Sequence, residues 1–327
     1  MKILLTGGDG RLGNVLVRKL LEQGHQVKVL LEKSRKNPES LQGLAIEPVY
    51  GDILDRNTVA EALEDVEVVY HLAAKISLYP DKDGSTWAIN VEGTQNIANL
   101  ALEKKVKRFI HCSSHHALEK KPYNSPMDET RPLAFKEKST YHRAKAYAEQ
   151  IILDLVEKGL PALIVNPGTI TGPYDFEPSI FGQALIDMQA GKIPMLMEGL
   201  SDYADVRDIA DTMVTCLERG RIGERYFLTG DLLNMRELSA LVGKITGKKT
   251  PKKILPLWVM YMLLPFIQLS AKLKGEKPLF TSDMLHAAQS NPVVSHEKAK
   301  QELNFHPRSI EESLRDAFEW YQENGKM

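Results

Sequence analysis

The first 168 residues alternate between short apolar runs and longer amphipathic segments. Runs rich in Val, Ile and Leu predict β-strands, which lie at 2–7, 26–31, 45–51, 66–73, 106–114 and 161–168. Between them, apolar residues recur at helical spacing; in the first such segment Leu12, Val15, Leu16 and Leu20 share one face before Gly24 ends the helix. Apolar strands that alternate with helices are buried on both faces, so the pattern predicts an α/β, doubly wound parallel sheet.

After residue 168 the pattern changes. Gly, Pro and Met become frequent in "GPYDFEPSIFGQ" and "AGKIPMLMEG", which is typical of loops and short helices around a pocket. One more strand near 224–230 predicts a return to the main sheet. We therefore expect a main domain at 1–168 with return segments near 203–230. A smaller, interleaved C-terminal region, at 169–202 and 231–327, is expected to bind the substrate.

The most apolar stretch is "ILPLWVMYMLLPFIQL" at 254–269. It is shorter than the roughly 20 residues that span a bilayer, and it contains two prolines, so we expect no stable membrane insertion. A packed helix pair or a pocket wall is the favoured interpretation. A helix lying on a membrane surface is the alternative.

Charge and cysteine content narrow the function classes. The chain has 42 Lys and Arg against 43 Asp and Glu, so its net charge of −1 gives no overall signature of nucleic-acid or anionic-membrane binding. The two cysteines, Cys112 and Cys216, are isolated in sequence and fit a reducing compartment. The N-terminus lacks the pattern of a signal peptide. We therefore expect a cytoplasmic protein that acts on a small molecule.

A glycine-rich loop joins the first strand to the first helix in "LLTGGDGRLGNVLVRKLL". Gly7 permits a tight turn, Gly10 lets the backbone approach a pyrophosphate, and Gly13 lets the helix pack closely against the strand. The helix N-terminus then offers free N–H groups to the phosphates. The spacing and context predict a dinucleotide site of the Rossmann type.

Residues after the second and third strands are expected to select the cofactor. Glu32 at the end of the second strand would accept hydrogen bonds from the ribose hydroxyls, which favours NAD. The basic residues Lys33, Arg35 and Lys36, together with Arg11 from the glycine loop, would instead hold the 2′-phosphate of NADP. We favour NAD, with NADP as the alternative. Asp52, after the third strand, would reach the adenine amino group.

Several motifs in a fixed order resemble one family. "TGGDGRLG", "GDI", "HLAA" (71–74), "NVEGT" (90–94), "YHRAK" and "NPGTITGP" (166–173), followed by "VRDIAD" (206–211) and "GERYFLTG", are similar to the extended short-chain dehydrogenase/reductase family of the NAD-dependent epimerase/dehydratase type. With "TGKKTPKKILPLW", the chain resembles the bacterial dihydroflavonol-reductase-like branch, close to sugar epimerases and 3β-hydroxysteroid dehydrogenases. The likeness covers nearly the whole chain.

Tyr141 and Lys145 stand four residues apart, so on a helix they share one face. A nearby ammonium group and an oxidised nicotinamide would both favour the phenolate and lower the pKa of the tyrosine, which would then act as general acid or base. As an exposed pair, the two would contribute only a few tenths of a kcal/mol. The resemblance implies the catalytic interpretation, with Ser114 polarising the substrate oxygen and Ser113 as second choice.

The loop pattern and the resemblance together predict which residues contact the cofactor. The cofactor would contact Gly7, Gly10, Arg11, Leu12, Glu32, Asp52, Ile53, Leu72, Ala73, Ala74, Tyr141, Lys145, Pro167, Gly168 and Ile170. No metal site is expected. His115 and His116 follow Ser114 at the exit of a strand, where adjacent side chains point to opposite sides, so we expect them to make a poor pair of metal ligands. They occupy the place where 4,6-dehydratases of the family carry an Asp-Glu pair, so a dehydratase is disfavoured.

Three functions stay open at this level. The favoured one is an NAD(P)-dependent reductase or dehydrogenase of a carbonyl or secondary alcohol. The alternative is a nucleotide-sugar epimerase with tightly bound NAD, which would need Arg and Asn from the second region, where Arg207, Asn234 and Arg236 are available. The third is a dinucleotide-binding regulator without turnover, which would not need the Ser114, Tyr141 and Lys145 set. The resemblance also implies a possible homodimer through helices near 88–104 and 142–158.

Overall fold

The core of the computed structural model is a seven-stranded sheet in which every strand pairing is parallel. The structure describes residues 1–77, 79–274, 280–288, 291 and 293–327. The strands are β1 (Lys2–Thr6), β2 (Gln26–Leu31), β3 (Ile46–Tyr50), β4 (Val68–His71), β5 (Arg108–Cys112), β6 (Ala162–Pro167) and β10 (Arg225–Leu228). The predicted doubly wound parallel sheet is confirmed.

The spatial order of the strands is β10-β6-β5-β4-β1-β2-β3. The order reverses between β1 and β4, and in sheets of this kind ligands bind outside the carboxyl ends of the strands at such a switch point. The glycine loop leaves β1 at this point, and the segment 72–74 leaves β4 beside it. The topology therefore brings two of the predicted cofactor segments together.

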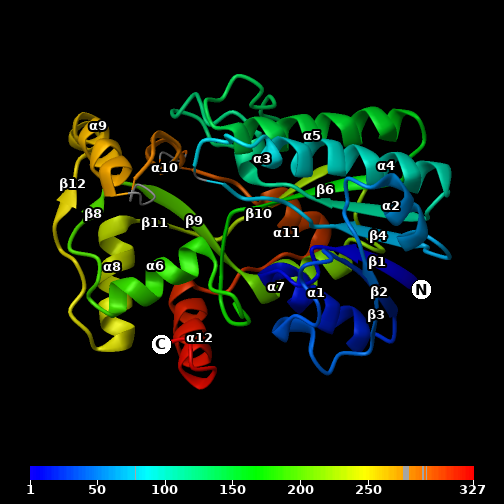
Figure 1. Cartoon of the computed structure of the whole chain (residues 1–327), viewed down its shortest axis with the longest axis horizontal. Coiled ribbons are helices and arrows are strands. Elements are labelled where there is room, and N and C mark those ends of the chain that lie inside the picture. The colour runs from blue at the N-terminus through cyan, green and yellow to red at the C-terminus, as the bar shows by residue number, and fades with distance from the viewer. Residues whose placement is uncertain (78, 275–279, 289–290, 292) are drawn as a thin grey trace.

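Alternating residues along each strand supply two cores. Ile3 and Leu5 of β1 belong to a cluster with α1 (Arg11–Glu22), α7 (Val206–Thr215) and α11 (Glu297–Leu303). Leu4 faces the opposite cluster, with α2 (Arg56–Ala62), α4 (Gly93–Glu103) and α5 (Thr140–Glu157). Helices thus cover both faces of the sheet (Figure 1).

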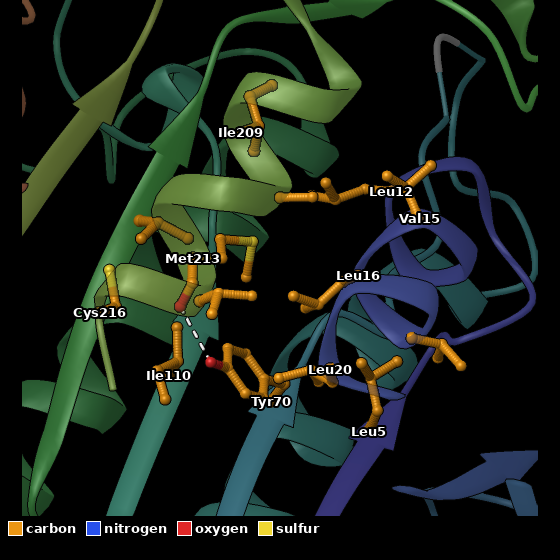
Figure 2. Close-up of a cluster of buried hydrophobic side chains, with 14 of the residues drawn as sticks. Leu5, Leu12, Val15, Leu16, Leu20, Tyr70, Ile110, Ile209, Met213 and Cys216 are labelled. Atoms are coloured by element: carbon orange, nitrogen blue, oxygen red, sulfur yellow. Dashed lines mark hydrogen bonds between the residues drawn. The ribbon is translucent and has the colours of Figure 1, made fainter. Parts of the chain in front are cut away.

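The first core is closed by a polar anchor as well as by apolar packing. The Tyr70 side chain is fully buried, and its hydroxyl donates a hydrogen bond to the carbonyl oxygen of Met213, at 2.9 Å. Leu16 and Leu20 of α1 point toward the same space between α1, α7 and the sheet (Figure 2). A hydroxyl that is buried without a partner would be destabilising, so this bond lets a large aromatic side chain fill the core.

A second, smaller body of structure follows β6. Its elements are β7 (Thr169–Thr171), β8 (Leu196–Met197), β9 (Leu200–Asp205), β11 (Asp231–Asn234), β12 (Ile254–Leu255), α6 (Ile180–Gln189), α8 (Met235–Thr246), α9 (Leu257–Lys274), α10 (Ser282–Ala287) and α12 (Ile310–Glu323). Strands β11, β9 and β7 form one sheet, and α6, α8 and α12 enclose a separate apolar cluster. Residues 275–279, 289, 290 and 292 of this part lie outside the described residues. The first half of the chain also contains four short helical segments, namely the 3₁₀ turn Glu39–Leu41, α3 (Ser85–Trp87), the π-helical turn Ala88–Glu92 and the 3₁₀ turn His115–Ala117.

Helix α9 contains most of the apolar stretch at 254–269 and packs on one side only. Met260 and Ala271 are buried on its inner face. Its outer face exposes large apolar side chains, namely Trp258, Tyr261, Met262, Leu263, Phe266, Leu269 and Leu273. The expectation of a packed helix pair or pocket wall therefore accounts for the inner face alone. No helix in the described part of the chain has both the length and the apolar character needed to cross a membrane.

Candidate active site

The glycine loop is shaped by close contacts that leave no room for side chains. Gly7 has φ +71°, and a Cβ there would lie 2.8 Å from the backbone nitrogen of Ala73. A Cβ on Gly13 would overlap the carbonyl oxygen of Gly7. Gly10 precedes α1, and no side chain caps its N-terminus. The first N–H groups of α1 therefore meet a backbone cradle that fits a pyrophosphate.

Arg11 differs from its predicted role. Its guanidinium donates to the carbonyl oxygens of Ile170, at 3.0 Å, and Gly172, and it pairs with Asp175 at 3.4 Å. These partners hold the side chain in the interior, between the glycine loop and the segment after β7. The guanidinium is thus not free to hold a ribose phosphate, and the backbone N–H of Arg11 is what the helix N-terminus offers to a ligand.

The residues expected at the ribose and adenine lie on the open end of the sheet. Glu32 directly follows β2 and is exposed. Arg35 bridges the loops, since it donates to Asp9 at 2.9 Å and to Glu177 at 2.8 Å. Asp52 is exposed after β3, where its carboxylate accepts a hydrogen bond from the N–H of Leu54. Arg35 is therefore engaged away from Glu32, whereas Lys33 and Lys36 remain exposed beside Glu32.

The wall of the predicted cofactor groove is apolar. Leu72, Ala73 and Ala74 are half-buried directly after β4, against Gly7. Leu12 and Ile53 are buried, each in one of the two sheet cores, so their side chains support the groove from behind. Small and apolar side chains along this wall let a flat ligand lie close to the strand ends.

Ser114, Tyr141 and Lys145 come together at the end of β5. Ser114 follows this strand, Tyr141 is in the first turn of α5, and Lys145 is one turn further on. All three are buried. The Nζ atom of Lys145 donates to the carbonyl oxygen of Cys112 at 3.0 Å, and the Ser114 hydroxyl interacts with the phenol of Tyr141. Helix α5 therefore presents its tyrosine and lysine to the strand that carries the serine.

The protonation of this trio differs from the expectation at one point. Burial raises the pKa of Tyr141, the Cys112 thiol raises it further, and Ser114 acts in the opposite direction. Burial also lowers the pKa of Lys145, which Cys112 and Glu149 oppose. In the protein without its cofactor the pKa of the phenol is therefore raised, because the effect of burial outweighs the opposing one. The protein alone thus keeps Tyr141 protonated, as a general acid requires.

A buried network that the sequence did not reveal fixes α5 against the sheet. Glu149 accepts hydrogen bonds from Asn166 at 2.5 Å and from Arg225 at 2.7 Å. Asn166 also donates to the carbonyl oxygen of Ser114 at 3.0 Å. The side chain of Glu149 is fully buried, so each of these bonds compensates a carboxylate removed from water. The network links the backbone of the catalytic strand end to the catalytic helix.

The predicted nicotinamide pocket contains an unpredicted carboxylate. Pro167 ends β6, Gly168 follows, and Ile170 lies in β7. A Cβ on Gly168 would overlap the carboxylate of Asp202, which is 1% exposed. Neither Asp202 oxygen has a hydrogen-bond partner among the described residues. The strand β9 also contains Ser201 and Asp205, so the sequence offered no signal that separated Asp202 from its neighbours.

Beside the trio lies a row of imidazole rings. The ring centroids of His115 and His116 are 4.0 Å apart, and those of His116 and His142 are 4.4 Å apart in a stacked arrangement. The expectation that His115 and His116 point to opposite sides is wrong, because the chain turns into a 3₁₀ helix after Ser114 and no longer alternates like a strand. His142 directly follows Tyr141, so the row adjoins the catalytic helix.

Buried charges surround this row. Burial, with Lys120 and His286 as further causes, holds the pKa of His142 well below its usual value. Burial also lowers the pKa of Lys120 to about 8, against the opposing effect of Glu137. His286 in α10 is hydrogen-bonded to Glu137. In the described part of the chain no group of three His, Cys, Asp or Glu side chains is arranged to hold a metal ion.

Comparisons with known proteins identify the family and confirm the fold. A model described as the NAD dependent epimerase/dehydratase family matches residues 3–228. Sterol demethylase protein B of Methylococcus capsulatus is 30% identical over 329 residues, which cover 100% of both chains. A putative dihydroflavonol 4-reductase of Synechocystis sp. is 31% identical over 98% of this chain and 94% of its own. The crystal structure of a protein named gox2253 superimposes with a TM-score of 0.87 at 34% identity, over 99% of each chain.

Proposed function

Because the chain belongs to the NAD-dependent epimerase/dehydratase family, we propose that it is a reductase or dehydrogenase that binds its nicotinamide cofactor reversibly. It transfers a hydride between that cofactor and a carbonyl or secondary alcohol. The observation that carries this proposal is the meeting of Ser114, Tyr141 and Lys145 at the end of β5, at the same edge of the parallel sheet as the glycine cradle after β1. A regulator without turnover would have no use for three buried polar side chains at that place.

A bound nicotinamide would accept or supply the hydride, and the protein would manage the proton. The Ser114 hydroxyl would donate a hydrogen bond to the substrate oxygen and orient it. Tyr141 would give its proton to that oxygen during reduction, or take it during oxidation. Lys145, held by the Cys112 carbonyl, would stabilise the phenolate that reduction leaves behind. The buried setting strengthens each of these interactions, because it excludes water.

The second region supports the reductase over the nucleotide-sugar epimerase. An epimerase must hold a diphosphate, yet Arg207 is bound to Asp205 at 2.8 Å and to Asp316 at 2.6 Å. Asn234 caps α8 by accepting the N–H groups of Arg236 and Glu237. Of the three residues considered for this purpose, Arg207 and Asn234 therefore have structural roles, while Arg236 is exposed in the first turn of α8.

An uncharged and largely apolar substrate fits these observations. Two relatives are named for a sterol and for a dihydroflavonol. The imidazole row would give such a substrate a few polar contacts beside Tyr141, with His115 and Asp202 toward the nicotinamide pocket. Their Nδ1 and Oδ2 atoms are 3.5 Å apart. We propose the cofactor NAD over NADP, because Arg35 is engaged with Asp9 and Glu177 while Glu32 is exposed.

Two further features belong to the proposal. We place the protein in the cytoplasm, a reducing compartment that suits its two free cysteines. Burial raises the pKa of Cys112 to about 11 and that of Cys216 to about 12, which keeps both as unreactive thiols. We also propose a homodimer through α4 and α5, where Tyr147 exposes 41% of its surface. Mass measurement in solution, with Tyr147→Glu as the disrupting variant, tests the dimer.

The test of the function begins with the cofactor. The purified protein is denatured, any released nucleotide is identified by mass, and a second sample is desalted and titrated with NADH and NADPH. A reductase purifies largely empty, binds one of them reversibly, and oxidises it when apolar ketones are added. An NAD that survives desalting, without turnover of ketones or alcohols, would favour the epimerase. A preference for NADPH would refute the assignment of Glu32.

A further inference from the structure

The outer face of α9 is a continuous apolar surface. The most exposed side chains recur at helical spacing, with Trp258 at 65%, Met262 at 65%, Phe266 at 71%, Leu269 at 56% and Leu273 at 80% exposure. Large apolar side chains in such a stripe differ from apolar residues scattered singly over a surface. The inner face of the helix is already occupied by the protein, so the outer face is left for another surface.

The charges around α9 have one sign. Residues 248–274 contain six lysines and no Asp or Glu. Lys248, Lys249, Lys252 and Lys253 precede the helix, Lys272 lies in its last turn, and all five side chains are exposed without an ion pair among the described residues. One acidic group, Glu198, lies at the start of the helix, where its carboxylate accepts a hydrogen bond from the N–H of Leu257. The net charge of −1 for the whole chain conceals this local concentration.

We propose that α9 docks the protein on an anionic lipid surface. The helix lies in the plane of the interface, its outer side chains enter the headgroup and acyl boundary, and the lysines at both ends contact anionic headgroups. Trp258 and Tyr261 have the amphipathic rings that favour this depth. A second copy of the chain is a poorer occupant, because two helices packed face to face would bring lysine clusters of equal charge together.

The docked face is connected to the active site. Helix α9 packs against α10, and His286 of α10 is hydrogen-bonded to Glu137 and lies 6.4 Å, between ring centroids, from His142. A concave region of about 300 Å³ beside His286 is lined by Lys120, Lys121, Lys136 and Lys138, with Glu119 and Glu137. Lysines thus lie beside the loop that leads into Tyr141 as well as around α9. An apolar substrate dissolved in the lipid would reach the site from this side.

Flotation with vesicles tests the docking without any measurement of activity, so its outcome is independent of the proposed function. The full chain is mixed with vesicles of phosphatidylcholine alone or of phosphatidylcholine with phosphatidylserine. We expect binding to the anionic vesicles and its loss at high salt. Phe266→Ser with Leu273→Ser, and separately Lys252→Glu with Lys253→Glu, should each weaken binding about tenfold or more.

Matched controls separate the helix from general surface effects. Ile180 and Ile222 are 52% and 54% exposed, and Ile180→Ser with Ile222→Ser should leave binding unchanged. Arg219→Glu with Lys300→Glu provides the same control for charge, because both side chains are exposed and lie outside α4, α5 and α9. The proposal is overturned if the unmodified protein ignores anionic vesicles, or if the α9 variants bind as well as the controls. It is also overturned if the protein forms a dimer that Phe266→Ser with Leu273→Ser dissociates, while no form of it binds lipid.

Discussion

The central sheet and helix α9 are equally apolar in sequence and opposite in burial. Ile3, Leu4 and Leu5 of β1 are fully buried, because helices cover both faces of the sheet. In α9, by contrast, Phe266 and Leu273 are among the most exposed apolar side chains of the described chain. The same residue types therefore stabilise the fold in one region and offer a binding surface in the other. An apolar composition favours removal of a segment from water, and the packing of neighbouring elements determines which surface the segment contacts.

The two regions also use their polar residues differently. In the sheet region the polar groups at the strand ends, such as Ser114 and Lys145, gather at one place and form the candidate site. In the second region Arg207 and Asn234, which looked equally available for a ligand, hold helices in place. The following changes probe whether this division is correct.

The same Phe→Ala substitution should lower the free energy of unfolding strongly in the sheet region and hardly at all in α9. Phe109 is fully buried in the core below α4 and α5, and Phe109→Ala should lower the free energy of unfolding by about 3–5 kcal/mol. Phe266→Ala should change it by less than about 0.5 kcal/mol, because that ring is 71% exposed. Urea denaturation measures both. Comparable losses would mean that α9 is part of the core in solution.

Removal of one hydroxyl should separate chemistry from binding in the sheet region. Tyr141→Phe should lower kcat by about 10²–10⁴-fold while the affinity for the dinucleotide stays nearly unchanged. Tyr147→Phe on the same helix is the control, since its ring packs edge-on against Trp87 and Phe135. Steady-state rates and cofactor titration measure the two effects. Retention of more than about a tenth of the activity by Tyr141→Phe would refute the acid–base assignment.

Substitutions of Gly13 and Gly10 should distinguish the glycine that packs the helix against the strand from the glycine that makes room for the ligand. Gly13→Ala forces a Cβ against the Gly7 carbonyl and should destabilise the protein by about 1–3 kcal/mol, with loss of cofactor binding. Gly10→Ala places a Cβ 3.4 Å from the same oxygen and otherwise in open space, so the fold should persist. Its affinity for the dinucleotide should nevertheless fall about tenfold or more, because the pyrophosphate needs that space. Thermal unfolding and cofactor titration decide; unchanged affinity in Gly10→Ala would place the phosphates elsewhere.

The smallest effect concerns the imidazole row. Burial holds the pKa of His142 well below 6.5, so below that pH the unfolded chain binds a proton that the folded chain does not. Stability should therefore fall as the pH drops from about 7 to about 5, by up to about 1.4 kcal/mol per pH unit for this group. His142→Phe should reduce the slope, and the exposed His306→Phe should not. Equal slopes in all three proteins would show that His142 is hydrated in solution.

The sequence predicted the seven strands, the glycine loop and the residues at the strand ends because local patterns encode them. Short apolar runs, turn glycines and a Tyr–Lys pair at helical spacing are short-range features. It could not predict Asp202 beside Gly168, the Glu149–Asn166–Arg225 network, or the engagement of Arg11 with Ile170 and Asp175. These contacts join segments from 17 to more than 150 residues apart, and nothing in the local pattern of either partner identifies the other.

By itself, then, the sequence determined which segments of the first 168 residues become strands and helices and which family of sites the strand ends build, since those depend on residues near one another along the chain. After residue 168, where the pattern predicts loops and short helices, the structure also has the sheet of β7, β9 and β11. Tertiary structure decided the rest. It turned His115 and His116 into adjacent rings, because a 3₁₀ turn replaced the strand. It also gave α9 one covered face and one open face, because burial depends on which elements pack nearby and not on how apolar a segment is.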